Sequence, residues 1–396
     1  MNSDDVVIVS AVRSPIGSFG GQFKDLDAIQ MGVPVMQEVV KRAGIDPGII
    51  DDVGWGCCYQ QSTNQTNIGR VTLVKAGFPD HIPGFAVQRV CTSAMWATAV
   101  GTAAIKQGDA DVFLSGGVEC MSSVPYTIPA LRWGARMRNV ECRDAMWDGL
   151  TQLGIGPAMG VTAENLAKKY NISREEQDAI TLQDQQRAGA AMKEGRFKEE
   201  ILPIEVKKKG KMIAIDTDEH PKPDTTMEAL AALKPVFVKD GTVTAGNASG
   251  INDGASALII MRKSKADELG LKPMAKIVGF SVAGCDPDIM GWGPVPATQK
   301  LLAKTGLKIS DIGLWEIHKA FAAQYLACEK GLGLSDKRDI INVNGSGIAL
   351  GHPVGCTGTR LMITLLHEMR RRDVKRGLAT LCGGGGVAMA AIIELP

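Results

Sequence analysis

Two pairs of segments in this sequence resemble each other, and they constrain the fold more than any other feature. The stretch VVKRAGIDPGIIDDVGW (residues 39–55) is echoed by LLAKTGLKISDIGLW (residues 301–315). Each reads as a helix end with a glycine stop, a short polar link and a strand that carries tryptophan. CTSAMWATAVGTAAIKQGDADVFLSGG, which begins at Cys91, corresponds in the same way to CTGTRLMITLLHEMRRRDVKRGLATLCGG, which begins at Cys356. This internal duplication predicts two similar halves packed together.

Strands rich in β-branched residues alternate with alanine-rich helical patterns along both halves. The clearest strands are VVIVS (residues 6–10), DVFLS (111–115) and AKIVGF (275–280). Such alternation is typical of an α/β protein whose sheets are covered by helices. Residues from about 120 to 250 are more polar, and we interpret them as an inserted, largely helical loop domain. We therefore expect an N-terminal half over residues 1–270, including this insertion, and a C-terminal half over 271–396.

Charge and composition exclude several classes of function. The 44 Lys and Arg residues balance 43 Asp and Glu residues, and the net charge of +1 gives no global field toward nucleic acid or an anionic membrane. No apolar run resembles a signal peptide or a membrane span, so we expect a cytoplasmic protein. The nine cysteines are scattered without a C-x-x-C pair, which favours reduced thiols and no metal site. The basic run VKKKGK (206–211) is either a solvated hairpin or a rim contact for a phosphorylated ligand.

Three stretches could carry chemistry. Cys91 lies where an apolar strand ends and a helix of small residues begins, a setting that favours a thiolate nucleophile, although a buried cysteine is also common there. His352 stands between Gly351 and Pro353 in the glycine-rich NVNGSGIALGHPVGCTGTR, where a histidine can act as a base toward a thiol or be purely structural. Cys382 precedes four glycines whose N–H groups could form an oxyanion hole.

A fourth stretch, IHKAFAAQ (317–324), places His318 and Lys319 together at a predicted strand-to-helix junction. Neighbouring helical residues diverge by about 100°, so the two side chains should not face the same atoms. Lys319 either pairs with a carboxylate of the loop domain or of a neighbouring subunit, or it contacts an anionic substrate.

Together these stretches resemble the thiolase family over essentially the whole chain. The resemblance is carried by SAVRSPIGSFGGQFKDL, SGGVECMSSVPY, MGVTAENLAKKYNISREEQD, LKPVF, GNASGINDGASALIIM, NVNGSGIALGHPVG and LCGGGG. It implies the thiolase fold, in which two duplicated α/β halves form a five-layered α-β-α-β-α arrangement with an inserted loop domain. It also implies acyl transfer on acyl-CoA thioesters.

The resemblance implies a role for each matching residue. Cys91 matches the acyl-accepting nucleophile, His352 the histidine that activates it, and Cys382 the second cysteine, a general acid and base. His318 matches a residue that holds the thioester oxygen together with His352, and the N–H groups of Cys91 and Gly384 match a second oxyanion hole. The positions that match contacts to the pantetheine arm or its tunnel are Ser249, Met159, Phe237 and Phe321.

Three positions depart from the family pattern. Ala94 follows Ser93 where many members have glycine, Ala158 precedes Met159 where acetoacetyl-CoA-specific members have histidine, and Lys319 replaces a glutamate. The last two favour an acyl group larger than acetoacetyl, such as an aromatic or carboxylated one, with Lys319 as its contact. We therefore expect a degradative thiolase that cleaves a 3-oxoacyl-CoA.

Two alternatives remain open. One is an acetoacetyl-CoA thiolase in the condensing direction, and the other, of a different class, is a CoA-ester-binding subunit of a larger assembly. We expect coenzyme A as a substrate, no permanently bound cofactor, and a homodimer or homotetramer with a possible small accessory subunit.

Overall fold

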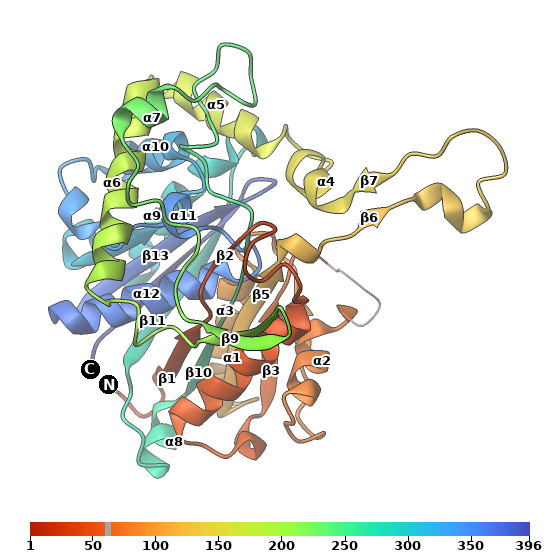
Figure 1. Cartoon of the computed structure of the whole chain (residues 1–396). Helices are drawn as coiled ribbons and strands as arrows, with labels where there is room; N and C mark the ends of the chain where they lie inside the picture. Colours follow the sequence, from red (N-terminus) through yellow and green to blue (C-terminus); the bar gives the residue numbers. More distant parts are fainter. Residues whose placement is uncertain (60–64) are drawn as a thin grey trace.

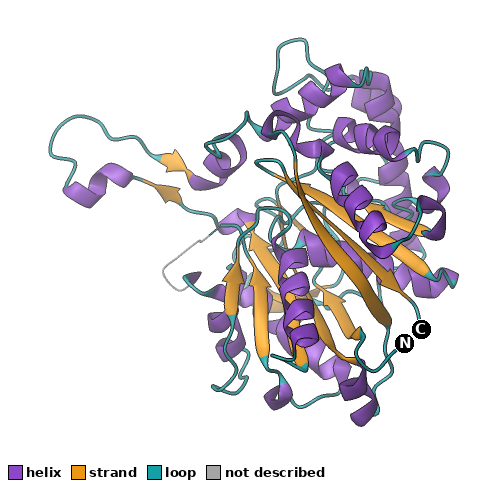
Figure 2. Cartoon of the chain, turned by 180° about the vertical axis from the view of Figure 1, so that it is seen from behind, coloured by secondary structure: helices purple, strands orange, loops and turns teal. Residues whose placement is uncertain are grey.

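A continuous ten-stranded sheet forms the centre of the computed structural model, which describes residues 1–59 and 65–396. Figure 2 shows the strands running through the molecule with helices around them. The strand order is β12-β13-β14-β11-β1-β10-β5-β3-β4, and β2 pairs with β10 beside this path. The strands are β1 (Val6–Arg13), β2 (Gly17–Ser18), β3 (Asp52–Gly56), β4 (Phe85–Val87), β5 (Val112–Cys120), β10 (Asn252–Arg262), β11 (Ala275–Gly284), β12 (Leu314–Ile317), β13 (Arg376–Gly383) and β14 (Val387–Glu394).

The two halves of the sheet repeat one pairing pattern. In the first half β1, β10, β5 and β3 pair antiparallel, antiparallel and parallel, and β11, β14, β13 and β12 do the same in the second half. The halves meet where β1 pairs antiparallel with β11 over two residue pairs. Trp55 in β3 and Trp315 in β12 occupy equivalent strands, and both are fully buried. The predicted duplication is confirmed by this topology.

The two halves of the sheet form two layers, and helices on their outer faces and between them form three more. One core cluster joins α1 (Ala28–Ala43) and α2 (Ile68–Lys75) to the outer face of the first half, and another joins α9 (Pro294–Thr305) and α10 (Ala322–Leu332) to the second. A third cluster places α3 (Ser93–Gln107) and α12 (Thr357–Arg372) between strands of both halves. The expected α-β-α-β-α fold is confirmed, and the layers can be followed in Figure 1.

The glycine stops predicted from the sequence end equivalent helices. Gly44 follows α1 with a φ of 68°, and Gly306 follows α9 with a φ of 69°. Both values lie in the left-handed region, where glycine has no Cβ clash. A 3-10 turn then leads into the tryptophan-bearing strand in each half: η1 (Pro47–Ile49) before β3 and η6 (Ile309–Asp311) before β12.

The segment between β5 and β10 carries most of the remaining elements. They are η3 (Met121–Ser123), β6 (Tyr126–Thr127), η4 (Pro129–Trp133), β7 (Arg143–Asp144), α4 (Ala145–Thr151), α5 (Met159–Lys169), α6 (Arg174–Lys193), β8 (Ile204–Lys208), β9 (Lys211–Ile215) and α7 (Met227–Ala231). Elsewhere lie α8 (Lys263–Glu268), η5 (Pro287–Trp292), η7 (Arg338–Ile340) and α11 (Gly347–Leu350). The basic run at residues 206–211 forms the β8–β9 hairpin with its lysines exposed, which confirms the hairpin interpretation.

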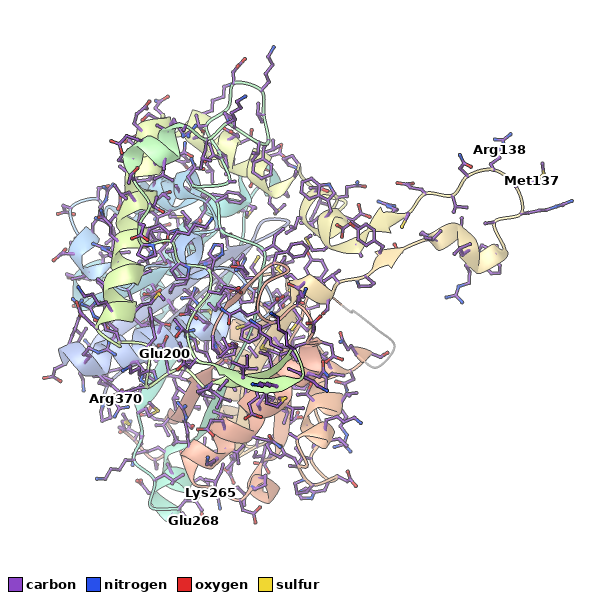
Figure 3. All side chains as sticks on the ribbon, in the orientation of Figure 1. Met137, Arg138, Glu200, Lys265, Glu268 and Arg370 are labelled. Atoms are coloured by element: carbon purple, nitrogen blue, oxygen red, sulfur yellow. The ribbon has the colours of Figure 1, made fainter. Side chains whose placement is uncertain are left out.

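An arm built on β6 and β7 projects from the body of the molecule (Figure 1), with Met137 and Arg138 near its tip (Figure 3). Its apolar side chains include Trp133, which is 89% exposed, and Met137, which is 80% exposed. No helix in residues 1–59 and 65–396 is long and apolar enough to cross a membrane.

Candidate active site

A cavity of about 550 Å³ brings together residues from both halves and from the insertion. Eight of the ten site residues expected from the sequence line it: Cys91, His352, Cys382, Gly384, Met159, Phe237, Ser249 and Phe321. The other two, His318 and Lys319, are not among its lining residues. The duplicated fold therefore gathers residues that are up to 326 positions apart, from Cys58 to Gly384, around one space.

Cys91 lies in a tight turn that leads into α3. Val90, directly before it, has a φ of 48°, which is a genuine outlier for a β-branched residue. The Ser93 hydroxyl donates to the Val90 carbonyl at 2.6 Å and accepts from the Arg89 N–H at 2.8 Å. Ser93 thus fixes a strained turn that aims the cysteine, as strained backbone often does at functional sites.

The environment of the Cys91 thiol favours its protonated form. Burial raises its pKa to about 12, and the N–H groups of Gly384 and of Cys91 itself oppose this shift. The sequence-based expectation that the helix start would lower this pKa is therefore wrong, because the loss of water around the sulfur outweighs the backbone dipoles. A base must take the proton as the sulfur attacks.

His352 is held as a neutral imidazole in one tautomer. Burial and the Arg360 charge lower its pKa to about 3. The single hydroxyl hydrogen of Thr357 is donated to the Pro353 carbonyl at 2.9 Å, so the same oxygen accepts from Nδ1–H of His352 at 2.7 Å. Nε2 then keeps its lone pair, which is the form a general base requires. Asn252 holds the backbone here by accepting from the His352 N–H at 2.8 Å.

His318 lies against His352, with ring centroids 4.2 Å apart and planes tilted by 50°. It is fully buried, and neither ring nitrogen has a hydrogen-bond partner within the described part of the chain. Burial, followed by the electrostatic interaction with the His352 ring and by the Arg360 charge, lowers its pKa well below the usual value. A neutral, unpaired imidazole in this place can accept or donate a hydrogen bond to a group bound near His352.

Cys382 and Gly384 lie at the end of β13 and just beyond it. Burial raises the Cys382 pKa well above its usual value, and nearby Cys91 adds to the shift, so this thiol can serve as an acid. The Gly384 N–H points at the Cys91 sulfur. A Cβ at residue 384 would lie 2.6 Å from Leu153 Cδ1 and 3.2 Å from Met159 Sδ, so glycine permits the close packing.

The rest of the cavity wall is mostly apolar, with Gln88, Thr151 and Ser249 among its polar members. Phe237 and Phe321 meet edge to face with ring centroids 6.3 Å apart. Sequence reasoning missed several further wall residues: Tyr59, Val90, Met121, Trp147, Leu153 and Met290. Among the described residues that line the cavity, none is Lys, Arg, Asp or Glu.

Comparisons with known proteins agree with this geometry. Residues 6–264 match the model of the thiolase N-terminal domain, and residues 271–395 match that of the thiolase C-terminal domain. This chain belongs to the thiolase family. It is 49% identical to an acetyl-CoA acetyltransferase of Syntrophomonas wolfei, over 98% of this chain and 99% of that protein.

Solved thiolase structures superpose closely on the chain. The Bacillus anthracis acetyl-CoA acetyltransferase gives a TM-score of 0.97 at 49% identity, and human mitochondrial 3-ketoacyl-CoA thiolase gives 0.96 at 42%. Each comparison covers 99% of both chains. The protein is thus an acyltransferase enzyme of the thiolase family.

Lys319 in this thiolase takes the first of the two places expected from the sequence, and not the second, a contact with an anionic substrate. Its ammonium lies 2.7 Å from Asp184 of α6, and the two side chains are 1% and 0% exposed. The proposed contact with a substrate carboxylate is therefore not made, because Lys319 points into the packed interface with the insertion. The alternative interpretation, a pair with a carboxylate of the loop domain, is what the structure shows.

Glu119 is a further buried group of this thiolase site that sequence reasoning missed. It lies in β5, and its carboxylate accepts from the N–H groups of Cys58 at 2.9 Å, Tyr59 at 3.2 Å and Gly355 at 2.9 Å. Burial raises its pKa to about 7. It ties the loop after β3 to the loop before α12. The sequence feature that could have pointed to Glu119 is a single acidic residue in the largely apolar and glycine-rich strand VFLSGGVEC.

Proposed function

We propose that this enzyme catalyses the reversible thiolytic cleavage of a 3-oxoacyl-CoA by CoA through an acyl-cysteine intermediate on Cys91. The observation that supports this most strongly is the set of groups around one cavity. It combines a thiol, a neutral imidazole with a free Nε2, a second thiol and the N–H of Gly384. Acyl transfer between thioesters needs a nucleophile, a base, an acid and an oxyanion hole.

In the first half-reaction His352 Nε2 takes the Cys91 proton while the sulfur attacks the 3-keto carbon. The N–H groups of Cys91 and Gly384 receive the developing oxyanion. The bond between C2 and C3 of the substrate then breaks, leaving the acyl group on Cys91. The electron pair goes to C2 of acetyl-CoA, whose thioester oxygen is stabilised by His318 and His352. Cys382 gives its proton to C2 and becomes a thiolate.

In the second half-reaction CoA replaces acetyl-CoA in the cavity. The Cys382 thiolate takes the proton of the CoA thiol, whose sulfur attacks the acyl carbon on Cys91. The tetrahedral intermediate uses the same N–H pair and collapses to acyl-CoA, and the Cys91 sulfur recovers its proton from His352. The acyl-cysteine is itself a thioester of energy similar to that of the acyl-CoA product, so the transfer of the acyl group between Cys91 and CoA is reversible.

The cavity wall favours an uncharged acyl group. An isolated carboxylate is expensive to bury without a countercharge, and among the described lining residues there is no cation. The wall instead offers aromatic and sulfur-containing side chains such as Phe237, Phe321 and Met159. We therefore propose a degradative enzyme for 3-oxoacyl-CoAs with a larger apolar or aromatic acyl group. Carboxylated acyl groups fit this cavity less well.

A second candidate is acetoacetyl-CoA thiolase activity in the condensing direction. It is favoured by the printed names of the Syntrophomonas wolfei and Bacillus anthracis relatives, both acetyl-CoA acetyltransferases. The human neighbour, a 3-ketoacyl-CoA thiolase, favours the first candidate. The two differ in acyl pocket and direction of flux, while the groups described above serve both.

A substrate panel distinguishes the candidates. The purified enzyme is given CoA and acetoacetyl-CoA, longer straight-chain, aromatic or carboxylated 3-oxoacyl-CoAs, and the loss of each is followed. The proposal expects the highest kcat/KM with a longer or aromatic neutral substrate. A highest value with acetoacetyl-CoA would select the second candidate. If no substrate is cleaved, the remaining hypothesis is a CoA-ester-binding subunit that acts with a partner.

The remaining expectations accompany this proposal. We propose CoA as a substrate with no permanently bound cofactor, a homodimer or homotetramer, and a cytoplasmic location. The exposed Trp133 and Met137 on the projecting arm support self-association, because exposed apolar groups commonly mark contact surfaces. Light scattering of the purified protein gives the assembly directly, and an excess of mass beyond copies of this chain would reveal an accessory subunit.

A further inference from the structure

Lys319 and Asp184 form a buried ion pair between the C-terminal half and helix α6 of the insertion. Lys319 Nζ donates to Asp184 Oδ1 at 2.7 Å, and the Tyr325 ring centroid lies 4.4 Å from the same ammonium. A buried pair is weak evidence for stability, because the loss of hydration offsets the attraction between the charges. The other contacts of the two residues therefore indicate what the pair does.

Asp184 binds the backbone of the loop that contains His352. Its second oxygen, Oδ2, accepts from the backbone N–H groups of Ser346 and Ala349, both at 3.1 Å. These residues begin the short helix α11 (Gly347–Leu350), and His352 follows two residues after its end. One carboxylate thus joins the Lys319 ammonium to the backbone of the His352 loop.

Lys319 joins the same loop to His318, its neighbour in sequence. Its backbone N–H donates to Ser346 Oγ at 3.4 Å. A Cβ at residue 347 would lie 2.4 Å from His318 Cε1 and 2.5 Å from the Lys319 carbonyl oxygen. The loop therefore lies directly against His318, and small displacements of it would change how the two imidazoles meet.

We propose that Lys319 and Asp184 are positioning residues that hold the His352 loop against His318 and thereby fix both imidazoles relative to Cys91. The proposal rests on the proposed function for what the imidazoles do. Lys319 provides the countercharge for the Asp184 carboxylate in a dry interface, because a buried carboxylate without a partner is costly and moves to regain one. Such a movement weakens its hold on Ser346 and Ala349.

Lys319→Met and Asp184→Asn test the proposal, with Lys319→Arg as the conservative variant. The matched control is Arg338→Met, which leaves the buried Glu329 carboxylate without its 2.6 Å partner. Neither Arg338 nor Glu329 lines the cavity. All proteins are compared below the lowest melting temperature of the set, by the rate of Cys91 alkylation with iodoacetamide and by kcat and KM.

We expect Lys319→Met and Asp184→Asn to slow alkylation and lower kcat by about 10- to 100-fold, as misplacement of a catalytic group does, with little change in KM. Lys319→Arg should keep most of the wild-type alkylation rate and kcat. Arg338→Met should have a lower melting temperature than the wild type but the same alkylation rate. The proposal is wrong if Lys319→Met and Asp184→Asn lower the melting temperature without slowing alkylation. It is also wrong if Arg338→Met slows alkylation as much as they do. A wild-type enzyme that cleaves no 3-oxoacyl-CoA would overturn the proposed function, and the alkylation rates would still decide the role of the pair.

Discussion

The Nδ1 atom of His352 lies 2.7 Å from the hydroxyl oxygen of Thr357, and that hydroxyl donates onward to the Pro353 carbonyl. Both contacts are hydrogen bonds only when the hydroxyl donates to the carbonyl, since a carbonyl cannot donate. This arrangement therefore assigns the ring proton of His352 to Nδ1 and leaves Nε2 free to act as a base. A residue at the first position of α12 thus decides the chemistry of a histidine five residues earlier.

Thr357→Val should lower kcat by about tenfold or more, because the tautomer with a free Nε2 loses its fixed partner. Thr357→Ser keeps the hydroxyl and should keep most of the activity. Steady-state kinetics of the two variants, with melting temperatures measured alongside, check this. Equal activity in Val and Ser variants would show that the hydroxyl does not matter.

Brief incubation with a 3-oxoacyl-CoA in the absence of free CoA should leave an acyl group on Cys91. The reason is that Cys91 lies in the strained turn with the Gly384 N–H at its sulfur, whereas Cys382 is a deeply buried thiol. Intact-mass measurement followed by peptide mapping locates the adduct. An adduct on Cys382 would reverse the two roles.

His352→Ala and Cys382→Ser should fail at different stages. The first lacks the base that takes the Cys91 proton, and since the thiol pKa is raised to about 12, its acylation and its alkylation should both be slow at neutral pH. The second lacks the group that protonates C2, so it should still accept an acyl group from a simple thioester while losing carbon–carbon cleavage. The two partial reactions are measured separately; parallel losses in both variants would contradict this division.

Gly384→Ala should reduce kcat by about 100-fold, the usual effect of disturbing an oxyanion-hole donor. The added methyl would lie 2.6 Å from Leu153 Cδ1 and 3.3 Å from Val90 Cγ1, which are ends of side chains, so the protein should still fold. Adding Leu153→Ala removes the nearest obstacle and should restore part of the rate. No rescue together with a large loss of melting temperature would indicate a folding defect instead.

Glu316→Gln should change how stability depends on pH. Burial raises the Glu316 pKa to about 8, opposed by Arg360, whose NH1 atom lies 4.0 Å from the carboxylate. A carboxyl group whose pKa is raised on folding stabilises the folded state below its unfolded pKa, near 4.5, and this contribution is lost as pH rises through about 8. The free energy of unfolding of the wild type, relative to the variant, should therefore fall between pH 5 and pH 8 by up to about 1.4 kcal/mol per pH unit.

Urea unfolding of both proteins at several pH values checks this sign. A difference between wild type and Glu316→Gln that stays constant with pH would mean that Glu316 is ionised in the folded protein throughout the range.

Local signals were sufficient for most of the fold and for eight residues of the cavity, but not for further wall residues such as Tyr59 and Met290. Helices end at Gly44 and Gly306, as expected from the sequence. Glycine is a reliable signal there because the residue after a helix often adopts a left-handed conformation, which few other residues tolerate. Cys91 could be found because it stands at a predicted helix start in a stretch that resembles the nucleophile motif of the family, and His352, Cys382 and Gly384 because their motifs combine reactive side chains with glycines. Thr357 and Glu119 could not, because threonine after a glycine-rich loop and an acid within a strand have many ordinary explanations.

Sequence patterns alone indicated the duplicated α/β plan and the types of chemical group available, because periodicity, glycines and motif spacing act over a few neighbouring residues. The role of each group depends on the packing around it. The tertiary structure raised the Cys91 pKa where the helix start alone would lower it, since burial outweighs nearby dipoles. It also paired Lys319 with Asp184, 135 residues earlier, and turned both away from the cavity. Burial and long-range pairing depend on how the layers pack, which no local pattern specifies.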